Sequence, residues 1–185
     1  MDKINRVYEK FPILETKRFL LREVKREDLK NIYEIYSNIE VVKYQGMKEM
    51  CTLNQAKKSI DFIIKGFKNK KYIKWCIAEK ATEKVLGCIS LENFRDNNLI
   101  AEIGFTLNIK YWKQSIMSEA LKEVTKYAFN EIGLKSIEAK IHKDNIASIK
   151  LCLKLGFLIK CHKNKSLYNI KTEKYEDMSI YVLMK

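Results

Sequence analysis

The hydrophobic and polar positions of this chain follow two periods, which indicate helices and strands in turn. In some stretches apolar residues recur three and four positions apart, the spacing of one helix face. In others they alternate with polar residues, as in a strand with one buried face. In chain order we expect a strand over 16–24, helices over 26–36 and 52–67, strands over 72–79, 85–93 and 100–109, a helix over 114–132, a strand over 136–142, a helix from 144 or 145 to 155, and strands over 157–163 and 178–184.

Residues at the expected helix ends support these boundaries. Thr52, with Gln55 three positions later, has the spacing of a capping box. Gly133 follows the central helix, where a glycine commonly ends a helix. Asp144 or Asn145 is suited to cap the helix after them, because a short polar side chain accepts hydrogen bonds from free backbone N–H groups.

The order of these elements predicts an α/β or α+β fold built on a single sheet with about four helices flanking it. The chain has 185 residues, six glycines and one proline. We find no internal repeat and no linker. We therefore expect one domain over residues 1–185.

Composition excludes several classes of protein. The longest apolar stretch, 180–184, is far shorter than the ~20 residues of a membrane-spanning helix. The first residues lack the apolar segment of a secretory signal, which favours the cytoplasm. Five cysteines without a CxxC pair, and two histidines, favour reduced thiols and do not favour a metal site.

The net charge of +13 has two explanations. Lysines spread over solvated faces would account for it, and so would attraction to an anionic partner such as nucleic acid or a phosphate-bearing cofactor. Aromatic residues between lysines over 67–75 superficially fit a nucleic-acid stacking platform. Phe67 continues an apolar helix stripe and Trp75 lies in a strand-like run, so we expect both in the core and no direct nucleic-acid binding.

A strand, a tight turn over 111–114 and a helix follow one another near the middle of the chain. Free backbone N–H groups at a helix N-terminus point outward and can bind an anion. By itself this geometry is weak evidence, because most strand-to-helix turns bind nothing.

Several blocks together carry a more specific signal, because they are in the order of one family. The chain resembles the GNAT acyltransferase superfamily, and within it the RimJ/RimL ribosomal-protein N-acetyltransferases. The resemblance covers residues 15–184 and implies a mixed, mostly antiparallel central sheet. Its blocks are ETKRFLLR at 15–22, GCIS at 87–90, AEIGF at 101–105, YW at 111–112, EAL at 119–121, NIASIKL at 145–151, KLGF at 154–157 and YED at 175–177.

This resemblance implies acetyl-CoA as cosubstrate and a primary amine as acceptor. The pantetheine arm would lie along the central strand, at Phe105, Thr106 and Leu107, where a backbone N–H would polarise the thioester carbonyl. Glu102 matches the position of a general base in several family members. Alternatively, Glu102 is only a solvated or ion-paired residue of the strand.

Asn145, Ser148 and Cys152 lie in the helix expected from 144 or 145 to 155. Asn145 would contact the cofactor arm, and Ser148 matches a serine that positions water in RimL-like members; a capping hydroxyl is its alternative role. Many relatives have a tyrosine proton donor where this chain has Cys152, which we expect to be a small buried apolar residue. The glutamate that RimL-like members carry between the last two strands has no counterpart over 165–169.

The expected pyrophosphate loop departs from the family pattern. It comprises Trp112, Lys113, Gln114, Ser115, Ile116 and Met117. Relatives have small residues at 115 and 117 and an additional glycine at 113. A β-carbon costs most where φ must be positive. Ser115 could still bind phosphate and Lys113 could attract it, but Met117 would have to point away from the cofactor.

Two functions remain open at this point. The first is acetyl transfer from acetyl-CoA to a protein N-terminal α-amine, possibly ribosomal, or to a small amine. The second is a degenerate GNAT-fold protein that binds CoA weakly and acts as a binding module. The acceptor loops, expected over 37–52 and 164–176, carry no signature, and the chain could be a monomer or a homodimer.

Overall fold

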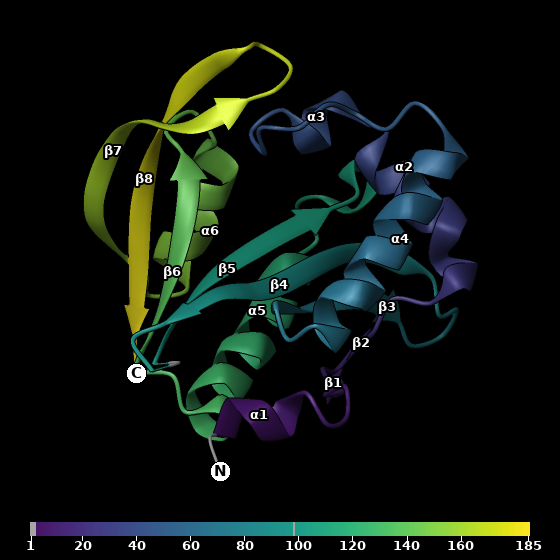
Figure 1. The fold of residues 1–185 in the computed structure, drawn as a ribbon, viewed down its shortest axis with the longest axis horizontal. Helices are drawn as coiled ribbons and strands as arrows, with labels where there is room; N and C mark the ends of the chain where they lie inside the picture. Colours follow the sequence, from purple (N-terminus) through teal and green to yellow (C-terminus); the bar gives the residue numbers. More distant parts are fainter. Residues whose placement is uncertain (1–2, 98) are drawn as a thin grey trace.

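The computed structural model describes residues 3–97 and 99–185 and contains one central sheet with helices on both faces (Figure 1). Its strands are β1 (Leu14–Glu15), β2 (Phe19–Arg22), β3 (Tyr72–Glu79), β4 (Val85–Arg95), β5 (Ile100–Leu107), β6 (Ser136–His142), β7 (Leu158–Asn169) and β8 (Lys174–Met184). Its helices are α1 (Lys3–Val7), α2 (Leu29–Tyr36), α3 (Ile39–Val42), α4 (Leu53–Lys68), α5 (Ile116–Tyr127) and α6 (Ile146–Lys154), with 3-10 turns η1 (Arg26–Asp28) and η2 (Ile109–Tyr111) and a π-helical turn η3 (Ala128–Ile132).

The eight strands form one sheet in the order β1-β2-β3-β4-β5-β6-β8-β7. Every neighbouring pair is antiparallel except β5 and β6, which are parallel. The prediction of a mixed, mostly antiparallel sheet is confirmed. The helices outnumber the four expected, because α1 and α3 are short segments without a full amphipathic repeat.

Alternation along the strands divides the core into two layers. Ile103 and Ile137 belong to a cluster that α5 completes with Ala120, Leu121 and Val124. The opposite face, including Cys76 and Cys88, packs against α2, α3 and α4. In Figure 1, α2 and α4 cover the β3–β4 side of the sheet, whereas β7 and β8 form a long hairpin that curves beyond them. One face of β5, β6 and β8 is therefore not fully covered by helices.

The parallel strands β5 and β6 separate soon after they meet. They pair only from Ile100 with Ser136 to Glu102 with Glu138, although β5 continues to Leu107 and β6 to His142. Figure 1 shows the two strands diverging upward from this short ladder. Within the described residues, one edge of 103–107 consequently has no partner strand, and its backbone groups are available to a ligand. We call this divergence the fork.

Several element boundaries differ from the sequence expectations. Within the first expected strand, 16–24, only Phe19–Arg22 (β2) is a strand, and β1 precedes it. The central helix begins at Ile116 rather than at Gln114. Strand β7 continues to Asn169 through an irregular register between Lys163 and Leu167, where the sequence does not alternate. The caps at Thr52, Gly133 and Asn145 are confirmed.

Core packing explains the aromatic residues that suggested a stacking platform. Trp75 is completely buried, and its indole N–H donates to the Pro12 carbonyl over 2.7 Å. Phe67 packs against the same core and lies beside Phe11 and Tyr8. The expected core role of both residues is confirmed. Among the described residues, no helix is long and apolar enough to cross a membrane.

Candidate active site

The fork brings the sequence-predicted residues of β5 to an open edge of backbone. Phe105 and Leu107 turn their side chains toward the α5 layer, where they pack against the core. Thr106 faces the opposite layer and its hydroxyl accepts a hydrogen bond from Gln45 over 3.2 Å. The unpaired edge can therefore form hydrogen bonds of strand type with an extended ligand that contains amide groups.

The turn after β5 adopts a backbone that glycine normally provides. Lys113 and Ser115 have φ angles of 60° and 58°, in the left-handed region. These are two of the positions where the family pattern has glycine. Residues 112–115 are exposed and lead directly into α5, whose first N–H groups have no partner within the helix. The loop thus keeps left-handed backbone at two of the substituted positions.

Contacts from distant parts of the chain hold this loop in place. The Arg18 guanidinium donates to the Gln114 carbonyl over 3.2 Å and to the Glu119 carboxylate over 2.8 Å. The Trp112 indole N–H donates to the Leu107 carbonyl over 2.9 Å. Burial alone would raise the pKa of Glu119, but its hydrogen bonds with Thr16 and Arg18 and the charge of Arg18 hold that pKa below its usual range. Sequence reasoning missed this role of Arg18.

The two apolar residues at the start of α5 point away from the open loop. Ile116 and Met117 are buried in the core cluster that includes Ala120. Met117 therefore does not project into the exposed turn. The left-handed turns, the exposed loop and the free helix N-terminus fit a pyrophosphate group. Lys113 is exposed at the same turn and adds positive charge.

Glu102 lies at the base of the fork and is bonded to neighbouring side chains. Asn93 donates to one carboxylate oxygen over 3.1 Å and Arg95 to the other over 3.3 Å. Arg95 also bonds Glu138, which accepts from Lys160 over 2.7 Å. Glu102 is therefore part of an ion-pair network, while 30% of its side chain stays exposed.

A second carboxylate lies beside Glu102, and sequence reasoning did not identify it. Glu92 on β4 is the direct cross-strand partner of Glu102. If Gly104 carried a β-carbon, that atom would lie 3.5 Å from Glu92 Oε1 and 2.9 Å from the Ser90 hydroxyl oxygen. Burial raises the pKa of Glu92, the charge of Glu102 raises it further, and Lys74 opposes the shift. Only the pairing register of β4 and β5 could have revealed this arrangement.

The start of α6 places its predicted residues near the other arm of the fork. The Asn145 side-chain oxygen accepts from the Ser148 backbone N–H over 3.2 Å and caps the helix. Among the described residues the Ser148 hydroxyl has no hydrogen bond, so it is not the capping group. Cys152 is completely buried, and burial raises the pKa of its thiol to about 12. The expectation that Cys152 is a small buried core residue is confirmed.

The loop after α3 crosses the open end of the fork. Gln45 bonds Thr106 on β5, and the Tyr44 ring stacks on His142 of β6 with 5.0 Å between ring centroids. The loop consequently bridges both arms of the fork on the face opposite α5.

The same loop is tied to the β7–β8 hairpin. The Ile170 N–H donates to the Gly46 carbonyl over 3.1 Å, and Lys171 forms an ion pair with Glu49 over 3.1 Å. Together with the hairpin, the loop over 44–49 therefore forms a wall around the uncovered face of β5, β6 and β8.

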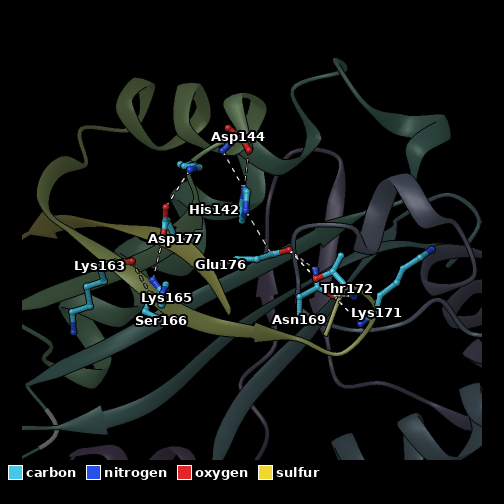
Figure 2. Close-up of polar contacts among 11 residues, drawn as sticks. His142, Asp144, Lys163, Lys165, Ser166, Asn169, Lys171, Thr172, Glu176 and Asp177 are labelled. Carbon is cyan, nitrogen blue, oxygen red and sulfur yellow. Dashed lines mark hydrogen bonds and ion pairs between the residues drawn. The ribbon is translucent and has the colours of Figure 1, made fainter. Parts of the chain in front are cut away.

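A polar network connects His142 to the hairpin, as Figure 2 shows. The Asp144 backbone N–H donates to His142 Nδ1 over 3.1 Å, so the hydrogen of the neutral ring is on Nε2, 3.5 Å from Glu176 Oε2. Glu176 Oε1 accepts from Asn169 over 2.8 Å. Next to it in Figure 2, Asp177 accepts from the Lys165 backbone N–H over 3.0 Å. These bonds fix the hairpin beside β6.

Comparison with known proteins agrees with the geometry. Residues 18–158 match the family model "Acetyltransferase (GNAT) domain". This chain belongs to the GNAT acetyltransferase family. The GNAT family uses acetyl-CoA as acetyl donor.

Individual relatives and structures have the same fold. The "Uncharacterized N-acetyltransferase YoaA" of Bacillus subtilis is 35% identical over 147 residues, covering 80% of this chain and 83% of YoaA. The ribosomal-protein-serine acetyltransferase of Escherichia coli is 28% identical over 100 residues, 54% of either chain. A solved structure of RimL, a ribosomal L7/L12 alpha-N-protein acetyltransferase, in complex with coenzyme A has a TM-score of 0.79 at 17% identity, covering 94% of this chain and 98% of that one.

A pocket of about 310 Å3 opens beside the base of the fork, on the face opposite α5. Glu102 and Glu138 contribute its carboxylates. The hairpin and β6 contribute Lys140, Lys160 and Lys163, and β4 contributes Arg95. Lys160 and Arg95 are paired with Glu138, whereas the Lys140 ammonium donates to the Ser166 carbonyl over 3.0 Å. The lining therefore carries more positive than negative charge.

Proposed function

We propose that this chain acetylates a primary amine by direct attack on acetyl-CoA in a ternary complex, with a protein N-terminal α-amine or a small amine as acceptor. The fork is the observation that carries the proposal. It offers an unpaired strand edge on β5, with a phosphate-binding turn at the end of that strand. A walled face for the acceptor lies on the side of the sheet away from α5.

Some residues of the fork would bind the cofactor, and others would take part in the reaction. The edge at Phe105, Thr106 and Leu107 would hold the pantetheine arm, and one of its N–H groups would polarise the thioester carbonyl. The loop over 112–117 would hold the pyrophosphate. Asn145 would contact the arm from the other side of the fork. The unbonded hydroxyl of Ser148 would position a water molecule or the departing sulfur.

Charge on the acceptor face favours one class of amine. The pocket beside Glu102 has four cationic side chains and two carboxylates, and a polyamine would be repelled there. An α-amine followed by neutral or acidic residues would find Lys140 and Lys163 available as partners. We therefore favour a protein N-terminus, or an amino acid with its carboxylate, over a polycationic acceptor. The name of the E. coli ribosomal-protein-serine relative supports the same choice.

Calorimetry and a thiol-release assay test this proposal. Acetyl-CoA should bind with a measurable heat, and N-terminal peptides with acidic second and third residues should release CoA faster than spermidine-like amines do. If acetyl-CoA gives no detectable binding at millimolar concentration, the chain is instead a degenerate GNAT-fold binding module. If it binds but every amine is inert, the acceptor class is wrong and the cofactor site stands.

A further inference from the structure

We propose that Glu92, rather than its neighbour Glu102, takes the proton from the acceptor amine. This inference rests on the proposed function, since it assigns a step of the acetyl transfer to one side chain. It concerns a residue of β4, one strand further from the fork than the position that the family resemblance pointed to. Three observations carry it, and they are independent of one another.

The first observation is that the β5 residue between Glu92 and the fork has no side chain, with only Ser90 and Glu92 beside it. Glu92 lies on the acceptor face, and only β5 separates β4 from the fork. The residue of β5 in between is Gly104, and Glu92 Oε1 lies 3.5 Å from the point where a side chain would begin. Because Gly104 has no side chain, nothing from that position stands between the carboxylate and an amine at the fork.

The second observation is the difference in bonding between the two glutamates. Both oxygens of Glu102 accept hydrogen bonds, one from Asn93 and one from Arg95. Among the described residues, Glu92 has neither a hydrogen bond nor an ion pair within 4.0 Å. The Glu92 oxygens are not among the fully buried unpaired atoms of the described residues, so a ligand can reach them. Glu92 is thus free to accept a proton, whereas both oxygens of Glu102 are already engaged by Asn93 and Arg95.

The third observation is the set of charges around Glu92. Glu102 faces it from β5, while Tyr72 and Lys74 face it from β3, and Tyr36 of α2 lies beside Lys74. Burial and the charge of Glu102 raise the pKa of Glu92, against the opposing charge of Lys74. A higher pKa makes a carboxylate a better proton acceptor near neutral pH. Glu102 therefore acts as a positioning residue whose charge increases the basicity of Glu92.

The proton balance of the reaction is complete with these groups. Glu92 takes one proton from the ammonium group and leaves a neutral amine. The nitrogen lone pair forms a bond to the thioester carbon, the C–S bond breaks, and the sulfur leaves with its electron pair. The second proton of the attacking nitrogen passes to that sulfur. Products are the amide and CoA thiol, and Glu92 returns its proton to solvent.

The pH dependence of kcat at saturating substrates tests the assignment. We expect Glu92→Gln to lower kcat at neutral pH by about 100-fold, the low end for loss of a general base, and to abolish the acid limb of the profile. Acetyl-CoA affinity by calorimetry should stay within about threefold of wild type, because Glu92 does not contact the cofactor arm. Glu79→Gln, on β3 at a distance from the fork, is the matched control and should leave both quantities unchanged.

Two more variants separate Glu92 from Glu102. Glu102→Gln removes a like charge, so we expect the acid limb to move to lower pH with a smaller loss of kcat. Gly104→Ala places a methyl group against Ser90 and Glu92 and should lower kcat while acetyl-CoA still binds. A Glu92→Gln variant with the wild-type profile, or a Glu102→Gln variant that alone loses the acid limb, would overturn the assignment. An inactive wild-type enzyme would instead contradict the proposed function.

Discussion

Replacing the strained residues of the cofactor loop with glycine should stabilise the protein. Lys113 and Ser115 have φ angles of 60° and 58°. The left-handed conformation costs a residue with a β-carbon roughly 1–2 kcal/mol. Glycine avoids this cost, but its greater freedom in the unfolded chain destabilises the folded state by about 0.5–1 kcal/mol. We therefore expect each of Lys113→Gly and Ser115→Gly to raise the free energy of unfolding by about 0.5–1 kcal/mol.

Urea denaturation and thermal melting measure this gain. One kcal/mol corresponds to a rise in Tm of about 2–4 °C for a chain of this size. Acetyl-CoA affinity should be retained in Ser115→Gly, because the backbone N–H groups keep their positions. In Lys113→Gly it should weaken severalfold, since a charge near the pyrophosphate is lost.

Two control variants test whether relief of the left-handed conformation causes the gain in stability. Lys70 has a φ angle of 55° after α4, so Lys70→Gly should stabilise the fold to a similar extent without any effect on acetyl-CoA binding. Gln114 lies between the two strained residues with negative φ and donates to the Lys110 carbonyl. Gln114→Gly should therefore destabilise the protein. If Ser115→Gly leaves stability unchanged or lowers it, the loop is not strained and the reasoning is refuted.

Three further predictions follow from named contacts. Asp28→Ala should cost about 3–5 kcal/mol by urea denaturation, because Asp28 and Arg22 form a buried bidentate ion pair at 2.8 and 2.9 Å; an equally stable variant would show that this ion pair is not needed. Arg18→Ala should weaken acetyl-CoA binding severalfold while changing unfolding by at most about 1 kcal/mol, since the Arg18 ion pair is exposed; unchanged affinity would contradict its role as anchor of the loop. The Cys152 thiol has its pKa raised to about 12 in the folded state, so its stabilising contribution is complete below the unfolded pKa and is lost as the pH rises from about 9 toward 12. The stability difference between wild type and Cys152→Ala should shrink over that range, and a constant difference would show that the thiol does not titrate with unfolding.

Local patterns predicted the regular parts of the fold well. The strands at Tyr72–Glu79 and Ser136–His142 have the expected bounds. Short helices such as α1 and α3 were not predicted, since fewer than two turns show no amphipathic repeat. The boundary of β7 was also wrong: an irregular register interrupts the alternation after Lys163, so the strand continues where the pattern stops.

The candidate site depends on contacts that a linear pattern does not contain. The sequence showed that glycines were missing from the cofactor loop, but only the structure shows that Lys113 and Ser115 adopt the glycine conformation. An anchor far away in the chain, Arg18, holds that loop. Likewise, Glu92 gains its environment from the register with Glu102 and from the missing side chain at Gly104.

The short ladder between β5 and β6 also determines how the amides of the site exchange with solvent. Alternate N–H groups along 103–107 point to the side without a partner strand, so they should exchange fast in the free protein although they lie within a sheet. Ile100 and Glu102, which pair with strands on both sides, should exchange slowly. A bound cofactor would supply the missing partner and slow the fast set. Hydrogen exchange along this one strand thus reports occupancy of the site without any knowledge of the acceptor.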